Sequence, residues 1–172
     1  TVDGQAGGED LTLAAGIGDV TFTGITGGTT ALGDVSVTSG INITSADMTV
    51  ETYVVVATGD VTANGDITAT AAGGIDIQSG SDGTGDISFG AGVILQNDTI
   101  VLRSGDGNGG STTAKADLVT NSPTFRGSGG GGTSPTTFTY RQDAAITDAD
   151  IPALAQFDGG LTGTTYTIRS DD

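Results

Sequence analysis

Short apolar–polar–apolar triplets, separated by Gly and Asp, recur through the first hundred residues of this chain. In an extended segment, the two outer side chains of a triplet point to one face and the middle one points to the other. β-Branched residues occupy most outer positions and Thr or Ser most middle ones, which is typical of half-buried strands. The triplets therefore predict an all-β chain of very short strands. They lie at 11–13, 20–22, 35–37, 41–43, 48–50, 67–69, 75–77, 87–89 and 100–102.

The spacing of the triplets predicts how the strands are arranged. From residue 35 to residue 75 a triplet begins every six to eight residues, so every third one recurs after about 20 residues. Three strands per coil, stacked coil on coil, predict a right-handed parallel β-solenoid (a triangular β-helix). A β-sandwich is the alternative, although its strands are longer and its turns lie further apart. The three predicted series begin at 35, 54, 75 and 93; at 41, 61, 81 and 100; and at 29, 48, 67 and 87.

The composition excludes several classes of function. The chain has no Cys and no His, so it holds no Ser-His-Asp triad, no Cys-His pair and no ordinary zinc site. A formal net charge of −16 argues against nucleic acid and anionic membrane as partners. No apolar run approaches the ~20 residues that span a bilayer. The chain starts with Thr rather than Met, and we expect a mature or excised segment without a signal peptide.

The dipeptide Gly-Asp precedes Val or Ile five times, at 18–19, 33–34, 59–60, 65–66 and 85–86. We interpret these dipeptides as corners in which Gly supplies a positive φ and Asp bonds the local backbone. The alternative is a Ca²⁺ site, since carboxylates and glycine turns are typical of calcium loops. Its best candidates are Asp82 and Asp86, in a segment that is similar to the Gly/Asp nonapeptide of calcium β-rolls but occurs once. No other cofactor is predicted.

The regular pattern decays after about residue 102. We therefore expect regular solenoid coils over 1–112 and irregular coils over 113–172, with Gly-rich loops at 104–112 and 121–137. A short helix is predicted at about 150–157, with Asp150 as its N-cap and Pro152 in its first turn. A final strand is predicted at 166–168.

Charge is distributed unevenly along the chain. Residues 1–102 contain 13 Asp and Glu and no Lys or Arg, whereas all five basic residues lie between positions 103 and 169. This asymmetry suggests a head-to-tail interface, in which a basic C-terminal end faces an acidic N-terminal end. Chance variation among five residues is the alternative. The residues assigned to this interface are Asp3, Glu9, Asp10, Arg141 and Arg169.

Two other kinds of site are considered. Asn42 and Asn97 each begin an Asn-x-Thr sequon, so each is a candidate for N-glycosylation, with a structural role between coils as the alternative for Asn42. A carboxylate pair for hydrolysis would come from Asp60, Asp86 and Asp106. These lie at predicted corners that solvent surrounds, and the chain has no Trp to bind a sugar ring. We therefore predict that the chain is not an enzyme.

Two segments resemble a known family of bacterial proteins. The stretch GDVTFTGITGGTTALGDVSVTSGINITSADMTV (18–50) resembles filamentous-haemagglutinin-type surface proteins and the repetitive passengers of autotransporters and two-partner secretion systems. Residues 138–172 are similar to segments of such long repeat proteins. The resemblance implies a secreted right-handed β-solenoid that serves as a stalk, adhesin or fibre outside the cell. It brings no catalytic residue.

Two functions remain from this sequence. In the first, the chain is a subunit or repeat segment of an extracellular surface fibre, stacked head to tail on another copy or continued in a longer chain. In the second, it is an adhesin passenger segment whose loops at 104–112 and 121–137 bind a host, surface or glycan ligand. Both place the chain outside the cell or on its surface.

Overall fold

The computed structural model describes residues 1–5, 8–105 and 114–170. Within these residues the chain is mostly β, and its only helical segments are two 3-10 helices, Asp148–Asp150 and Leu154–Gln156. The strands are β1 (Leu11–Ala14), β2 (Val20–Thr21), β3 (Leu32–Ser39), β4 (Ile43–Ser45), β5 (Met48–Val56), β6 (Val61–Ala63), β7 (Ile67–Ala69), β8 (Ile75–Ser79), β9 (Ile87–Phe89), β10 (Ile94–Gln96), β11 (Thr99–Ser104), β12 (Thr124–Arg126), β13 (Thr137–Gln142) and β14 (Thr165–Ser170).

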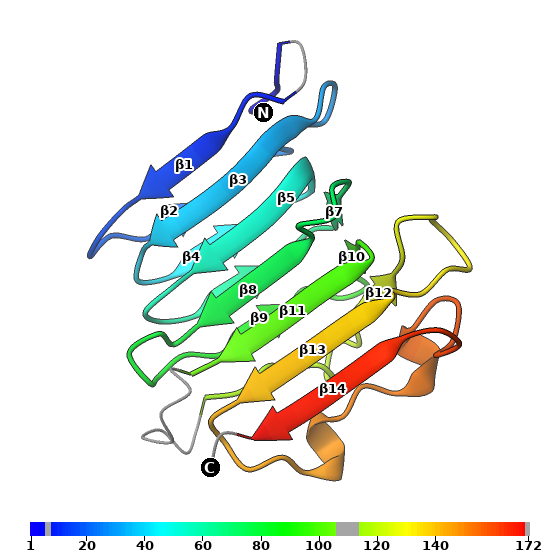
Figure 1. Cartoon of the computed structure of the whole chain (residues 1–172). Helices are drawn as coiled ribbons and strands as arrows, with labels where there is room; N and C mark the ends of the chain where they lie inside the picture. The colour runs from blue at the N-terminus through cyan, green and yellow to red at the C-terminus, as the bar shows by residue number, and fades with distance from the viewer. Residues whose placement is uncertain (6–7, 106–113, 171–172) are drawn as a thin grey trace.

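All strand pairs among the described residues are parallel. Ten strands form one curled sheet, and β2, β4, β6 and β9 form a second sheet. The larger sheet bends within β5, because this long strand pairs with β7 through its first residues and with β8 through its last ones. Figure 1 shows β1, β3, β5, β8, β11, β13 and β14 side by side and pointing the same way, with the two chain termini at opposite ends of the row.

The strands align in three columns of residues in register, which we call the front, back and side columns. The partners in a column lie from 18 positions apart, as for Val35 and Tyr53, to 38 positions apart, as for Ile100 and Phe138. The front column is Leu11, Val35, Tyr53, Ile75, Ile100, Phe138 and Tyr166; the back column is Val20, Ile43, Val61 and Ile87; the side column is Met48, Ile67, Leu95 and Phe125. Isolated bridges extend the side column to Val2 and Thr26 at one end and to Phe157 at the other.

The predicted series are correct in part. Residues 35 and 75 share the front column, 48 and 67 the side column, and 61 lies in the back column. The front-column residue of β5, however, is Tyr53 and not Val54. After residue 75 the predicted series are wrong, because the extra residues between β8 and β9 form a turn at Ser81 instead of a strand. Ile87 consequently pairs with Val61, and Ile100 pairs with Ile75.

Inward side chains of the middle strands form one apolar core. Val61, Ile67, Ile75 and Ile100 are each 0 % exposed. Burial of such aliphatic groups stabilises a fold by about 1.5–3 kcal/mol each. The triplet pattern therefore identifies the inward face in these strands. It is wrong at 41–43, because Ile41 lies outside the strand and is 39 % exposed, whereas β4 begins at Ile43.

The C-terminal part is more regular than the sequence predicts. The segment 121–137 contains β12, which pairs with β10, and β13 continues the front column. The single helix predicted at 150–157 is replaced by the two 3-10 helices, because Ile151 between them has extended backbone angles (φ −91°, ψ 120°). A residue that precedes Pro, here Pro152, is pushed into that conformation. The predicted strand at 166–168 lies within β14.

Aromatic residues fill the interior at the C-terminal end. The rings of Phe125 and Phe138 have centroids 4.6 Å apart, and the ring of Tyr166 stacks on Phe138 at 5.2 Å with an interplanar angle of 13°. Phe157 contacts Phe125, Phe138 and Tyr166 at 5.2–5.3 Å. These rings form the C-terminal end of the apolar core.

Candidate functional site

We call one passage of the chain through the columns a row. The acidic residues at one corner form a ladder of hydrogen bonds that connects successive rows. Oδ1 of Asp19 accepts hydrogen bonds from the backbone N–H and from Nδ2 of Asn42, both at 3.0 Å. Oδ1 of Asn42 then accepts from the N–H of Asp60 (3.1 Å), Asp60 from the N–H of Asp86 (2.9 Å), and Asp86 from the N–H of Lys115 (2.9 Å). Each side chain therefore satisfies a backbone donor in the next row, not in its own corner.

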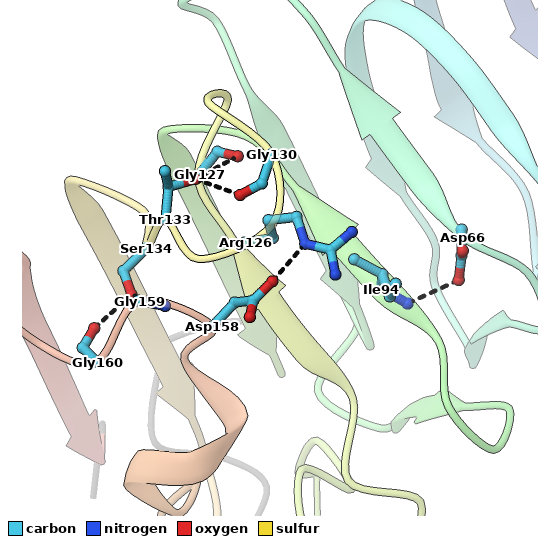
Figure 2. A network of polar contacts seen from close by, with 10 residues as sticks. All are labelled: Asp66, Ile94, Arg126, Gly127, Gly130, Thr133, Ser134, Asp158, Gly159 and Gly160. Carbon is cyan, nitrogen blue, oxygen red and sulfur yellow. Dashed lines mark hydrogen bonds and ion pairs between the residues drawn. The ribbon is translucent and has the colours of Figure 1, made fainter.

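The other corners repeat this contact. Asp47 accepts from the N–H of Asp66 at 3.0 Å, and Asp66 accepts from the N–H of Ile94 at 2.8 Å, a contact drawn in Figure 2. Asp10 likewise accepts from the N–H of Asp34 at 2.9 Å. The Gly-Asp dipeptides thus take part in hydrogen bonds between rows. The sequence instead suggests that each Asp bonds the backbone of its own turn.

The glycine of the dipeptide has a steric role. A Cβ added at Gly65 would lie 2.3 Å from Oδ1 and 2.4 Å from the backbone nitrogen of Asp47, and one at Gly59 would lie 2.7 Å from Oδ1 of Asn42. A positive φ is required at Gly85 (φ 156°), whereas Gly59 and Gly65 do not have one. The expectation that these glycines supply a positive φ is therefore wrong at both positions. There, glycine makes room for the carboxylate or amide of the preceding row.

The calcium candidates occupy separate hydrogen-bonding arrangements. Oδ1 of Asp82 accepts from the N–H and the Oγ1 hydroxyl of Thr84, both at 3.2 Å, and Asp86 belongs to the corner ladder. Within the described part of the chain, no group of three or more Asp, Glu, His or Cys side chains is placed to hold a metal ion. The calcium assignment of Asp82 and Asp86 stays a prediction. Asp106, the third carboxylate considered for hydrolysis, lies outside the described residues, as does most of the loop 104–112.

The two sequons lie in different environments. Asn42 is exposed and donates from Nδ2 to Asp19. Asn97 is 1 % exposed, and its Nδ2 donates to the carbonyls of Ala69 and Ala71 at 2.8 and 2.9 Å. The folded chain leaves no room for a glycan on Nδ2 of Asn97, which instead satisfies two carbonyl groups of the preceding row. Glycosylation of Asn42 stays a prediction.

The residues assigned to assembly lie near the two ends of the stack. Asp10 precedes β1, and Oδ1 of Asp3 accepts from the N–H of Thr29 at 3.0 Å. The backbone carbonyl of Glu9 accepts a hydrogen bond from the N–H of Gly33 at 3.0 Å. Arg141 and Arg169 lie opposite each other on β13 and β14, at the other end. The acidic set and the basic set thus lie toward opposite ends of the structure, and their contact between copies stays a prediction.

The sequence does not reveal one feature, a row of three arginines. Arg103, Arg141 and Arg169 occupy one register position on β11, β13 and β14. Neighbouring strands lie about 4.8 Å apart, and like charges placed opposite each other are destabilising. Nη2 of Arg103 lies 2.5 Å from Oδ1 of Asp76, which offsets part of this repulsion. The row is invisible in the sequence, because its members are 38 and 28 positions apart.

A second ion pair ties the last rows together. Nε of Arg126 donates to Oδ2 of Asp158 at 2.6 Å, and Figure 2 shows the two side chains pointing toward each other. This hydrogen bond lowers the pKa of the Asp158 carboxyl. Next to it, Oγ1 of Thr133 donates to the carbonyls of Gly127 and Gly130 and closes the glycine-rich loop. The glycine-rich part of the loop predicted at 121–137 is thus a turn held by its own hydrogen bonds.

A shallow polar cleft of about 370 Å³ lies at the corner between the side and front columns. Asp98 in this cleft accepts from the hydroxyl and N–H of Ser128 at 2.5 and 2.9 Å, and these hydrogen bonds lower the pKa of the Asp98 carboxyl. The cleft hydroxyls of Thr70 and Thr136 donate to backbone carbonyls of the chain itself. The polar groups of the cleft thus form hydrogen bonds that connect neighbouring rows. Its lining residues are Thr70, Ala71, Ala72, Asn97, Asp98, Thr99, Ser128 and Thr136.

Burial raises the pKa of tyrosine hydroxyls in the interior. Burial raises the pKa of Tyr53 to about 12, even though its hydroxyl donates to Oγ of Ser45 at 3.1 Å. Burial also raises the pKa of Tyr166 to about 12, and the buried hydroxyl of Tyr166 has no hydrogen-bond partner among the described residues. Both groups are neutral phenols at ordinary pH.

Comparison with known protein families, curated proteins and solved structures finds no match to this chain. Among the residues with described structure, no helix has the length and apolar character needed to cross a membrane.

Proposed function

We propose that this chain is a non-enzymatic structural segment of an extracellular surface fibre, a right-handed three-sided β-solenoid that stacks head to tail on another copy or on the continuation of a longer chain. One observation carries the proposal. Inward apolar side chains of the middle rows are fully buried, whereas the partly buried ones that pack on the core belong to the first or last rows. These are Leu11, Leu13, Val20, Phe22, Tyr166 and Ile168.

The three columns support the solenoid. From β1 to β11 the chain visits the front, back and side columns in turn, and every strand pair among the described residues is parallel. Parallel crossover connections are right-handed in about 98 % of cases. Corner ladders, in which an acidic side chain binds the backbone of the next row, give each row its position on the one before.

The terminal rows support the fibre. β1 pairs only with β3, and β14 only with β13, within the described chain, so each exposes one strand edge. Such an edge is a template for another strand. The net charge of −16 keeps rods soluble and apart along their sides, which leaves the ends as the favoured contact. The resemblance to bacterial surface proteins favours a location outside the cell.

The proposal that the chain is not an enzyme is supported by the use of its carboxylates. Asp60 and Asp86, the two described candidates for hydrolysis, each bind a backbone N–H of the next row. Removing them from this ladder would cost hydrogen bonds that hold the corner together.

Negative-stain microscopy and sedimentation of the purified chain test the fibre. We expect unbranched filaments of uniform width for the wild type. Ile168→Asp, at an inward position of β14, should abolish them, because a charge would be buried without a partner at the joint. Thr167→Asp is the matched control, since Thr167 is exposed on the outer face of the same strand.

Two outcomes would contradict the proposal. One is a wild type that sediments as a monomer at high protein concentration. The other is a filament that Ile168→Asp and Thr167→Asp weaken equally. Discrete rods that bind cells or glycans would instead support the adhesin alternative.

A further inference from the structure

We infer that the joint between copies is a main-chain ladder between the free edge of β14 and the free edge of β1 of a second copy, with Tyr166 against Leu11 and Ile168 against Leu13. This inference rests on the proposed function, and it specifies the register of the contact and the chemistry that sets it.

The register follows from the front column. Leu11 begins this column and Tyr166 ends it, and two positions along, Leu13 and Ile168 begin and end the neighbouring inward column through Val37, Val55, Ile77, Leu102 and Tyr140. If a second copy continues both columns, each partly buried apolar side chain of β14 meets a partly buried apolar side chain of β1. A slip by one residue would turn every inward side chain outward, and this makes the register strongly specified.

The side column supports the same arrangement. Phe157 ends this column and Val2 begins it, through the bridges Phe125–Phe157 and Val2–Thr26. Val2 is 46 % exposed, although its in-register partner Thr26 is 1 % exposed. A copy that places β1 on β14 brings Val2 over Phe157 as well. Two of the three columns thus continue across the joint with apolar pairs.

The charged residues have a different part in the joint from the one that the sequence suggests. With Ile168 against Leu13, Arg169 lies against Ala14, and Asp10 is four positions away, about 13 Å along the strand. The carboxylate of Asp10 also accepts the N–H of Asp34 in its own chain. Direct Arg169–Asp10 ion pairs therefore do not form in this register.

Charge instead selects the occupant. The end with β1 belongs to the half of the chain without Lys or Arg, and the end with β14 carries Arg141 and Arg169. Two ends that both carry β1 repel each other more strongly than an end with β1 and the less acidic end with β14, so a second copy approaches head to tail. The apolar columns then fix the register.

Engineered disulfides test the register, because the chain has no Cys of its own. In the proposed joint, the outward residues Thr12 and Thr167 lie on adjacent strands, about 4.8 Å apart, within the Cα range of a disulfide. Within one chain they are about 29 Å apart, since β1 and β14 are the first and last of seven front strands. Oxidised Thr12→Cys/Thr167→Cys should give a ladder of covalent multimers that reductant reverses.

The matched control is Thr12→Cys/Thr165→Cys, which tests a slip of two residues. It should give about tenfold fewer covalent multimers, because its sulfur atoms are about 6.6 Å further apart along the strand. Single Thr12→Cys should give no covalent dimer, since two β1 edges do not meet. Raising NaCl from 0.05 to 0.5 M should change the filament fraction by less than about twofold, because the proposed joint contains no ion pair.

The outcomes separate this inference from the proposed function. Filaments that cross-link through Thr165→Cys as well as through Thr167→Cys would overturn the register and leave head-to-tail assembly intact. Covalent dimers of single Thr12→Cys, or filaments that dissolve in salt, would overturn the apolar head-to-tail joint. A wild type without filaments would overturn both proposals.

Discussion

Oδ1 of Asp60 accepts a hydrogen bond from the backbone N–H of Asp86, 26 positions further along the chain, at 2.9 Å. The N–H of Asp60 is in turn the donor to Oδ1 of Asn42. The side chain of Asp60 thus accepts a hydrogen bond from the next row, and its N–H donates one to the preceding row. Because the donor is a main-chain N–H, this contact does not require a particular side chain in the next row.

Removal of one rung should cost stability, whereas a polar replacement should not. Asp60→Ala leaves the N–H of Asp86 without its partner, and we expect a loss of about 1 kcal/mol in the free energy of unfolding. Asp60→Asn should lose less than about 0.5 kcal/mol, because Asn42 performs the same task with an amide oxygen. Urea unfolding at pH 7 measures both. Equal losses for the two variants would show that charge, not the hydrogen bond, stabilises the corner.

The glycine of the corner should be as sensitive as the carboxylate. In Gly65→Ala the new methyl group would lie 2.3 Å from Oδ1 of Asp47, so the row must shift, at a cost of about 1–3 kcal/mol. Gly131→Ala is the matched control, since a Cβ at Gly131 meets nothing within 4 Å and its φ is not positive. Thermal unfolding followed by circular dichroism compares them. A Gly65→Ala variant as stable as Gly131→Ala would contradict the steric role.

The inward faces of most strands could be predicted from the sequence, and particular residues show why other features could not. In Ile67–Ala69 the polar middle residue Thr68 marks the face correctly. In β5, Tyr53 and the three valines after it include no polar residue that would mark the faces. The triplet expected in this strand therefore begins at Val54, one position after the front-column residue Tyr53. Hydrophobic alternation is informative only where it is interrupted by polar residues.

Which strands pair with each other depends on where each connection begins and ends, and the triplet pattern does not show this. The turn around Ser81 and the long connection between β11 and β13 add residues without adding a row. The ladder of Asp60 and Asp86 and the row of Arg103, Arg141 and Arg169 arise only once these lengths are known. A Gly-Asp dipeptide looks the same whether its carboxylate binds the local turn or the next row.

The face assignment predicts a large contrast within one strand. Ile67 is 0 % exposed, and truncation to Ala would leave a cavity in the core, with an expected loss of about 2–5 kcal/mol. Thr68 points outward, so Thr68→Ala should change the free energy of unfolding by less than about 0.5 kcal/mol. Urea unfolding of the two variants makes the comparison. Similar losses would refute the assignment of the two faces.

Acid should weaken the fold through Asp98. Hydrogen bonds from Ser128 lower the pKa of the Asp98 carboxyl below its ordinary value of 3.8. The folded state therefore binds the proton less tightly than the unfolded chain does. This contribution to stability is fully present above the unfolded pKa and is lost as the pH falls through the folded pKa. The stability difference between the wild type and Asp98→Asn should thus be present at pH 6 and should shrink below about pH 4.

Urea unfolding at a series of pH values measures this difference. The outward variant Thr139→Ala, which removes no titratable group, should differ from the wild type by a constant amount. A difference for Asp98→Asn that is equally constant would show that the Ser128 contacts do not favour the carboxylate.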